Sequence, residues 1–266
     1  MLPGMDLEVI DKGHVTPPHP TPLLFVHGAW HAAWCWDEYF LDYFAERGYR
    51  ATALSIRGHG ASRTAKSLRT CSLVDYVADI RSVAATLGAE PVLVGHSMGG
   101  LLTQKYLESR AAPAGVLLAS VPPQGIARFL GRMTRKHPWL MAKSMATGKS
   151  LRFFGTAQLA REHLFSTATA ESDVRRHMAR LNEESQRMTV DALVLRLPKV
   201  NRVTTPLLVL GADDDAMLTR DEVHATARAY GTEAEFFAGM GHDMMLEPDW
   251  KAVAERIDTW LGQRRL

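Results

Sequence analysis

The sequence predicts an α/β fold in which a mostly parallel central sheet is flanked by helices on both faces. Short apolar runs, as expected of strands buried on both faces, recur at residues 23–26, 50–56, 91–94, 114–119 and 205–210. Stretches with helical periodicity separate most of these runs, and glycine-containing turns follow several of them. Strict alternation of strand and helix favours a parallel sheet.

The first half of the chain keeps this alternation. A short edge strand is expected at residues 7–10, before the first buried strand. The apolar residues Trp36, Phe40 and Phe44 indicate a helix that ends at Gly48. Ser72 is placed to cap a helix over 73–87, because a serine oxygen accepts the free N–H groups of a first turn.

The alternation stops after the strand at 114–119. Residues 125–199 have helical periodicity without convincing strands, and strands return at 205–210 and 234–237. An insertion between strands of a parallel sheet is expected to fold over their ends as a cap. We therefore predict a core domain formed by residues 1–121 and 201–266 and a helical cap formed by 122–200, whose methionine and aromatic side chains in part line an apolar pocket.

Composition places the chain among ordinary globular proteins. Its 266 residues are 46% apolar and 23% charged, which fits one large α/β domain with an insertion. The N-terminal stretch has neither a cationic start nor an apolar segment, so no signal peptide is expected. Two cysteines, Cys35 and Cys71, are too few for a disulfide framework and predict a reducing, cytoplasmic location.

Residues 91–102, PVLVGHSMGGLL, form the stretch around which the rest of the chain is organised. An apolar run enters Gly95-His96-Ser97-Met98-Gly99, and a helical pattern begins directly afterwards. This is the Gly-x-Ser-x-Gly pattern that exposes a nucleophilic serine on a strained strand-to-helix turn. The N–H groups of the following helix, chiefly that of Met98, are then available to an oxyanion.

Partners for this serine follow two later strands. Three aspartates, Asp213, Asp214 and Asp215, come after the strand at 205–210, and His242 follows the strand at 234–237. The carboxyl ends of parallel strands share one edge, so these groups are expected to meet Ser97 there. The order Ser, Asp, His predicts a nucleophile, an orienting acid and a general base.

The sequence resembles the α/β-hydrolase family over nearly its whole length. The motifs that carry the resemblance are FVHGAW at 25–30, RGHG at 57–60, GHSMGG at 95–100, VLGADDD at 209–215 and GMGHDMMLEP at 239–248. The resemblance implies a helical cap after the sixth strand of the fold. It also implies an oxyanion hole formed by the N–H groups of Ala29 and Met98. The family spacing Gly-x-x-Asp selects Asp214 as the triad acid, which leaves Asp213 and Asp215 as helix-capping or solvated carboxylates.

Two related activities are disfavoured by individual residues. Haloalkane dehalogenases and epoxide hydrolases of this fold carry aspartate where Ser97 stands. Hydroxynitrile lyases that share the His-Gly-Ala stretch follow the triad histidine with lysine, whereas this chain has Asp243.

The predicted cap is basic. Residues 122–200 hold 14 Lys and Arg against 6 Asp and Glu, and no acidic residue occurs between Ser109 and Arg161. Three interpretations stay open: a solvated cationic face, a peripheral contact with anionic lipid, or a site for an acidic substrate. A net charge of +2 and the absence of a recognition motif give no indication of a nucleic-acid partner.

Together these observations predict a serine carboxylesterase that needs no cofactor or metal and cleaves small to medium apolar esters through an acyl-enzyme. The alternatives are a hydrolase that uses the same triad on a C–C bond of a diketone or dienone, and a non-catalytic ligand receptor on a hydrolase scaffold. The oligomeric state is left open between monomer and homodimer.

Overall fold

The computed structural model describes residues 6–266. Residues 1–5 lie outside the described part. They belong to the expected core domain and to the N-terminal stretch for which no signal peptide is expected. Seven strands form one sheet in the order β1-β3-β2-β4-β5-β6-β7, parallel except for the edge strand β1. The strands are β1 (Val9–Lys12), β2 (Leu23–Val26), β3 (Ala51–Leu54), β4 (Val92–His96), β5 (Gly115–Leu118), β6 (Leu207–Ala212) and β7 (Ala234–Phe237). The predicted α/β class is confirmed.

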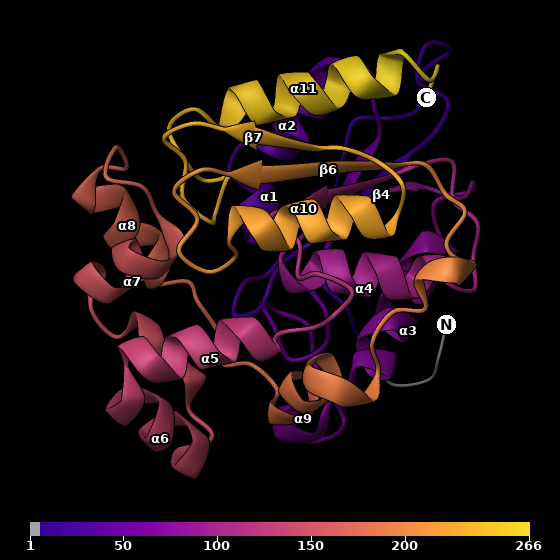
Figure 1. The fold of residues 1–266 in the computed structure, drawn as a ribbon. Coiled ribbons are helices and arrows are strands. Elements are labelled where there is room, and N and C mark those ends of the chain that lie inside the picture. Colours follow the sequence, from indigo (N-terminus) through magenta and orange to yellow (C-terminus); the bar gives the residue numbers. More distant parts are fainter. Residues whose placement is uncertain (1–5) are drawn as a thin grey trace.

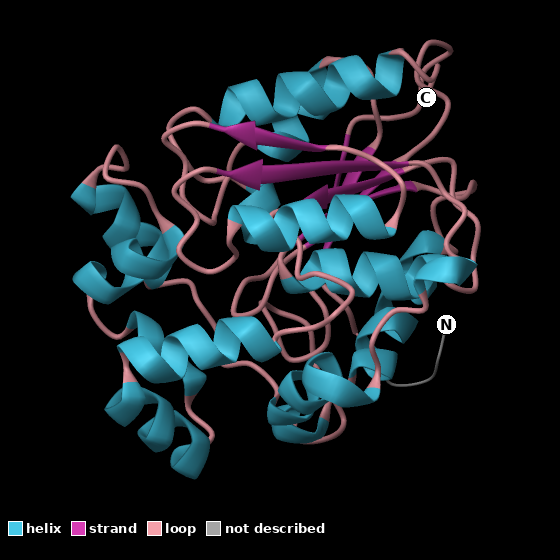
Figure 2. Ribbon diagram, in the orientation of Figure 1, coloured by secondary structure: helices cyan, strands magenta, loops and turns pink. Residues whose placement is uncertain are grey.

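Helices cover both faces of this sheet (Figures 1 and 2). One face carries α1 (Trp34–Asp37), α2 (Phe40–Glu46) and α11 (Trp250–Gly262), and the other carries α3 (Leu73–Ala84), α4 (Met98–Leu107) and α10 (Arg220–Ala229). Alternate residues of a strand serve the two faces. In β2, Phe25 packs in the first layer with Phe40, while Leu24 and Val26 pack in the second with Ile80.

The predicted start of α3 is confirmed in atomic detail. Ser72 accepts a hydrogen bond from the N–H of Asp75, and the Asp75 carboxylate accepts one from the N–H of Ser72, which makes a capping box. The helix ends at Ala84, three residues before its predicted end. The region predicted as one helix around Trp36 and Phe44 is two, because the backbone leaves helical geometry at Tyr39 (φ −147°).

All of the chain between β5 and β6 is helical or irregular. It contains α5 (Ala127–Lys136), α6 (Pro138–Thr147), α7 (Ala157–Leu164), α8 (Glu171–Met178) and α9 (Gln186–Val190). This insertion follows the fifth strand and not the sixth, because the described chain before β2 contributes only one strand. Figure 1 shows that the arrowheads of β6 and β7 point toward α7 and α8, so the inserted helices lie at the carboxyl edge of the sheet.

The insertion is joined to the sheet by apolar packing. Met133, Met141, Phe153 and Phe154 belong to the same buried cluster as Phe25. Of the helices described, none combines the length and apolarity needed to cross a bilayer. Both cysteines are buried free thiols.

A close backbone approach between α4 and β2 generates a stability prediction. A Cβ on Gly99, in the first turn of α4, would overlap the carbonyl oxygen of Val26 in β2, whereas a Cβ on Gly131 in α5 would meet nothing within 4 Å. Gly99→Ala should lower the free energy of unfolding by about 3 kcal/mol or more, because backbone atoms must move. Gly131→Ala should raise it by up to ~1 kcal/mol, the gain expected for alanine in a helix interior. Urea denaturation of the two variants tests this, and a Gly99→Ala protein as stable as the wild type would contradict it.

Candidate active site

Ser97 occupies a strained turn between β4 and α4. Its backbone has φ 52° and ψ −117°, a region that residues with a side chain rarely adopt. Hydrogen bonds fix the turn: the N–H of Ser97 donates to the Leu118 carbonyl (3.0 Å), and its carbonyl accepts from the N–H of Val121 (3.1 Å). A Cβ on Gly95 would lie 2.5 Å from the carbonyl oxygen of Gly99, so glycine at position 95 is needed for strand and helix to meet this closely.

Two further side chains complete a hydrogen-bonded chain with this serine. Nε2 of His242 lies 2.9 Å from Ser97 Oγ, and Nδ1 of His242 lies 2.8 Å from Oδ2 of Asp215. All three side chains are buried. With its proton on Nδ1, the ring donates to Asp215 and accepts from the serine hydroxyl. The arrangement can therefore take the serine proton during attack on a carbonyl.

The structure corrects the choice of Asp214 as the third member. Asp214 is exposed, and its backbone N–H donates to the Met240 carbonyl, while Asp213 pairs with Arg220. The reason is that β6 runs to Ala212 and the sheet pairing continues through Asp213, whose N–H donates to the Phe237 carbonyl. The turn therefore begins only after Asp213, and the carboxylate that meets His242 is that of Asp215, one position beyond the one that the family spacing selects.

Asp215 is itself fixed by backbone donors. Its Oδ1 accepts hydrogen bonds from the N–H groups of Met217 (2.7 Å) and Leu218 (2.9 Å), which leaves Oδ2 for His242. These donors fix the orientation of the carboxylate. It is therefore able to hold the imidazole in one tautomer and to stabilise its cationic form.

The segment after β2 packs against the turn that carries Ser97. A Cβ on Gly28 would lie 3.1 Å from Cβ of Ser97, so glycine permits this contact. The ring of His27 accepts from the N–H of Ile56 (3.1 Å) through Nε2, so Nδ1 donates to the Gly28 carbonyl (2.7 Å). Nδ1 of His31 lies 2.9 Å from the Ala29 carbonyl oxygen. The carbonyl groups of Gly28 and Ala29 therefore each face a histidine ring of the same segment.

Ala29 and Met98 line the cavity beside Ser97, as expected from the sequence. Neither of their N–H groups donates to a protein acceptor within residues 6–266. Two free N–H groups next to a serine hydroxyl are suited to receive an oxyanion.

A second buried histidine–carboxylate pair, which sequence reasoning missed, lies behind His242. Asp243 Oδ2 is 3.0 Å from Nε2 of His31, and Nε2 of His96 donates to the His242 carbonyl (3.0 Å). The HGAWH stretch and the residue after His242 were visible in the sequence, but their proximity was not. Burial alone would raise the pKa of the Asp243 carboxyl. The charge and hydrogen bond of His31, together with the charges of His96 and His242, lower it by more, so the pKa lies below its ordinary value.

These neighbours also set the basicity of His242. Burial lowers the pKa of His242, but the charge and hydrogen bond of Asp215 and the charge of Asp243 together raise it above its ordinary value of 6.5. Burial and the nearby His242 lower the pKa of His96 to about 3. His96 is therefore neutral at physiological pH and acts here as a hydrogen-bond donor to the backbone.

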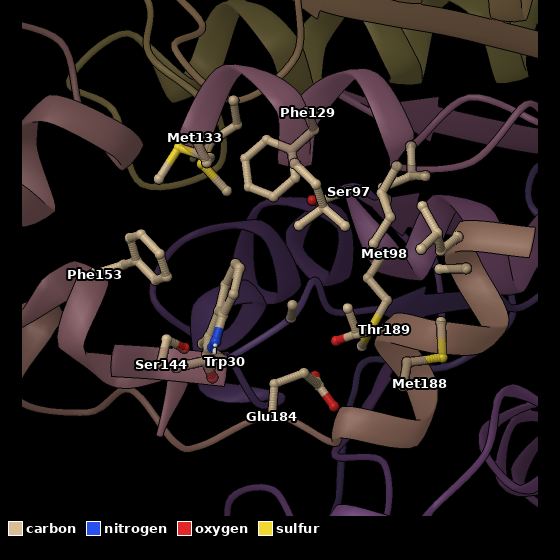
Figure 3. A pocket seen from close by; sticks show the side chains of 18 of the residues that line it. Trp30, Ser97, Met98, Phe129, Met133, Ser144, Phe153, Glu184, Met188 and Thr189 are labelled. Carbon is tan, nitrogen blue, oxygen red and sulfur yellow. Dashed lines mark hydrogen bonds between the residues drawn. The ribbon is translucent and has the colours of Figure 1, made fainter. Parts of the chain in front are cut away.

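Ser97 opens into a cavity of about 670 Å³ between the sheet edge and the inserted helices. Figure 3 shows Phe129, Met133 and Phe153 around it, with Trp30 projecting into the middle and Glu184 at the end away from Phe129. Glu184 is held by the hydroxyl of Tyr76 (2.8 Å) and lies 3.2 Å from Nε2 of His59. The lining is otherwise mostly apolar, which suits a small or medium apolar ligand.

Within residues 6–266, two groups of side chains have the spacing of metal ligands, and each contains a side chain that already binds other groups. In the group His96, His242 and Asp243, both nitrogens of His242 face Asp215 and Ser97. In the group His137, Glu162 and His163, Oε1 of Glu162 already binds Nζ of Lys136 (2.7 Å). A second cation beside that ammonium would be repelled. The residues present therefore fit a hydrogen-bonded triad better than a metal centre.

Part of the sequence matches curated proteins. The sequence is 38% identical over 107 residues to "Probable esterase PIR7A" of Oryza sativa subsp. indica, a match that covers 38% of this chain and 40% of the rice protein. It is 37% identical over 106 residues to a non-heme haloperoxidase of Rhodococcus erythropolis, covering 38% of each chain. The chain thus spans about two fifths of the length of these curated relatives.

The fold matches over the whole chain. An esterase structure from Exiguobacterium antarcticum aligns with a TM-score of 0.74 at 19% identity and covers 98% of this chain and 97% of that one. At this identity the likeness shows the fold alone. The profile of the Alpha/beta hydrolase family matches residues 23–256. With the motifs and the sheet order already described, this match shows that the chain belongs to the α/β hydrolase family.

Proposed function

We propose that this protein hydrolyses carboxylic esters through an acyl-enzyme on Ser97, with His242 and Asp215 as the other members of the triad. The observation that carries the proposal is the continuous chain from Ser97 Oγ through His242 to Asp215, with contacts of 2.9 and 2.8 Å, at the mouth of an apolar cavity. The esterase names of several relatives support the same chemistry.

The steps follow from the contacts. Ser97 Oγ attacks the ester carbonyl carbon while its proton passes to Nε2 of His242. The N–H groups of Ala29 and Met98 stabilise the oxyanion, an interaction for which each donor is typically worth about 10²- to 10³-fold in rate. Collapse breaks the ester C–O bond, and His242 protonates the departing alcohol. Water, deprotonated by His242, then attacks the acyl group and releases the carboxylic acid.

We also propose that the segment 122–200 acts as a cap that defines the acyl or alcohol pocket, with residues 6–121 and 201–266 as the catalytic core. Two buried free thiols, Cys35 and Cys71, fit a reducing compartment, for which we propose the cytoplasm.

The outer face of the cap supports a second proposal, a peripheral contact with anionic lipid. On α6, Trp139 is 84% exposed and Met145 is 72% exposed, and the exposed Lys143 lies one helical turn from Trp139. Within residues 6–266 Lys143 makes no salt bridge, whereas Arg132 and Lys136 of the same acid-free stretch pair with Glu222 and Glu162. Exposed aromatic and cationic side chains on one helix suit the interface of a negatively charged bilayer.

A panel of p-nitrophenyl esters of increasing acyl length tests the main proposal. Wild-type protein should show an optimum at short to medium acyl length, set by the cavity, and Ser97→Ala should lower kcat by about 10⁴-fold or more. A folded wild-type protein that turns over no ester would contradict the proposal and favour the C–C bond hydrolase. Full activity in Ser97→Ala would contradict the choice of nucleophile.

The three adjacent aspartates offer a matched test of the triad acid. Asp215→Asn should lower kcat by about 10⁴-fold, because the amide no longer stabilises the cationic imidazole or holds its tautomer. Asp214→Asn and Asp213→Asn change the same functional group in exposed side chains and should leave kcat close to the wild-type value. Steady-state kinetics on one ester decide the point, and a large loss in Asp214→Asn with none in Asp215→Asn would reverse the assignment.

The lipid contact is tested by co-sedimentation with phosphatidylcholine vesicles that contain or lack phosphatidylglycerol. Binding should require the anionic lipid and weaken with added salt, and Lys143→Glu should weaken it by at least about 5-fold, since one basic residue contributes roughly 1 kcal/mol near such a surface. Trp139→Ser should also weaken it, while Val74→Ser, which removes an exposed apolar side chain from α3, should not. Absence of binding, or unchanged binding by Trp139→Ser, would refute the contact.

A further inference from the structure

Trp30 lines the cavity with a backbone conformation that tryptophan rarely adopts. It follows directly on Ala29, it is half-buried, and its φ is 66°. A bulky residue in this left-handed region is an outlier that persists only where its surroundings fix it. Such outliers cluster at active sites and ligand clamps, which indicates a role for this ring in binding.

Contacts with the inserted segment fix both the backbone and the ring of Trp30. Its carbonyl accepts a hydrogen bond from the N–H of Asn182 (2.7 Å), and its Nε1 donates to Oγ of Ser150 (2.8 Å). The N–H of Ser150 in turn donates to the carboxylate of Glu183 (2.8 Å). The ring also packs edge-on against Phe154, with ring centroids 4.8 Å apart. To swing aside for a substrate, the indole would have to lose these contacts, so it acts as a fixed wall.

The apolar walls of the cavity belong to the two packing layers on either side of the sheet. The layer that contains Phe25 contributes Phe129, Met133, Met141, Phe153 and Phe154. The layer that contains Leu24 contributes Met98, Leu101, Val121, Met188 and Ala192. The first of these walls is rich in phenylalanine, whereas the second is formed by aliphatic and methionine side chains.

Trp30 lies between these two walls. Figure 3 shows its ring with Phe153 on one side and Met98 on the other, and with Ser97 beyond the tip of the ring. The serine therefore faces a compartment on each side of the indole. The acyl and alcohol parts of an ester leave the reacting carbonyl in different directions, so each part has a compartment of its own.

We propose that Trp30 is a specificity residue that divides the cavity into two separate compartments, one for the acyl part and one for the alcohol part of the substrate. The substrate class is then an ester with an apolar group on each side of the carbonyl, and the indole limits the length of both groups. This inference rests on the proposed ester hydrolysis and specifies its substrate.

Two series of esters test the proposal. Methyl esters of increasing acyl length probe one compartment and acetates of increasing alcohol length probe the other, with the released acid titrated at constant pH. In each series, wild-type kcat/KM should fall beyond a limiting length. Trp30→Gly should move both limits to longer chains, and should raise the ratio of kcat/KM just beyond each limit to kcat/KM at the limit by at least about 10-fold, the typical effect of one methylene in an apolar pocket.

The choice of glycine keeps the test free of backbone strain. Glycine adopts a positive φ readily, so Trp30→Gly removes the ring and suits the local backbone. Its circular dichroism spectrum should match that of the wild type. Trp30→Phe, which keeps a smaller ring without the N–H donor, should move both limits by less than Trp30→Gly does.

Phe129 provides the matched control. It also lines the cavity, but it belongs to one wall only, so Phe129→Ala enlarges one compartment and should move the limit of one series. If wild-type protein hydrolyses no ester, the proposed function fails, and this inference fails with it. If it hydrolyses esters but Trp30→Gly and Trp30→Phe move one limit or neither, or if Phe129→Ala moves both, the dividing role of Trp30 is overturned while ester hydrolysis stands.

Discussion

The close approach of α4 to β2 and β4 is the constraint on which the rest of the site depends. A side chain at position 95 or 99 would collide with backbone oxygens, so glycine at both positions lets the helix begin directly after the strand. Ser97, between strand and helix, then takes a backbone conformation with positive φ. Such a conformation costs about 1–3 kcal/mol and persists only where the surroundings fix it. Here the hydrogen bonds to Leu118 and Val121 of the neighbouring strand and its following turn do so. The strained turn exposes both the hydroxyl and the N–H of Met98.

At the same edge of the sheet, His242 and the residue after it are positioned by several independent contacts. Its carbonyl is held by His96, its Nδ1 by Asp215, and the next residue, Asp243, by His31. Beyond them Glu247 accepts from the N–H of Gly241 (3.0 Å) and from the hydroxyls of Ser166 (2.6 Å) and Thr169 (2.9 Å). This carboxylate therefore ties the loop that carries His242 to the segment between α7 and α8. Buried hydrogen bonds thus join the inserted segment to the loop that carries His242.

The sequence was sufficient to predict the fold class, the order in which serine, aspartate and histidine follow successive strands, and the serine and histidine that meet. Each of these follows from a local pattern. Buried parallel strands are continuous apolar runs, and their carboxyl ends share an edge. The aspartate that contacts His242 could not be predicted in the same way. Choosing among Asp213, Asp214 and Asp215 required the end of β6 to within one residue, and strand ends depend on pairing with β7, which lies more than twenty residues later. The position of Trp30 in the cavity, and the contact between His31 and Asp243 across more than two hundred residues, arise only from the tertiary fold.

The central claim is that His242 and Asp215 make Ser97 an activated nucleophile facing the cavity. The most direct measurement is covalent labelling with diethyl p-nitrophenyl phosphate, followed by intact-mass analysis and peptide mapping. The account predicts one diethylphosphoryl group per chain, located on the peptide that contains Ser97, one equivalent of p-nitrophenol released, and loss of labelling in His242→Ala. No labelling of folded wild-type protein, or labelling that persists in Ser97→Ala, would contradict it.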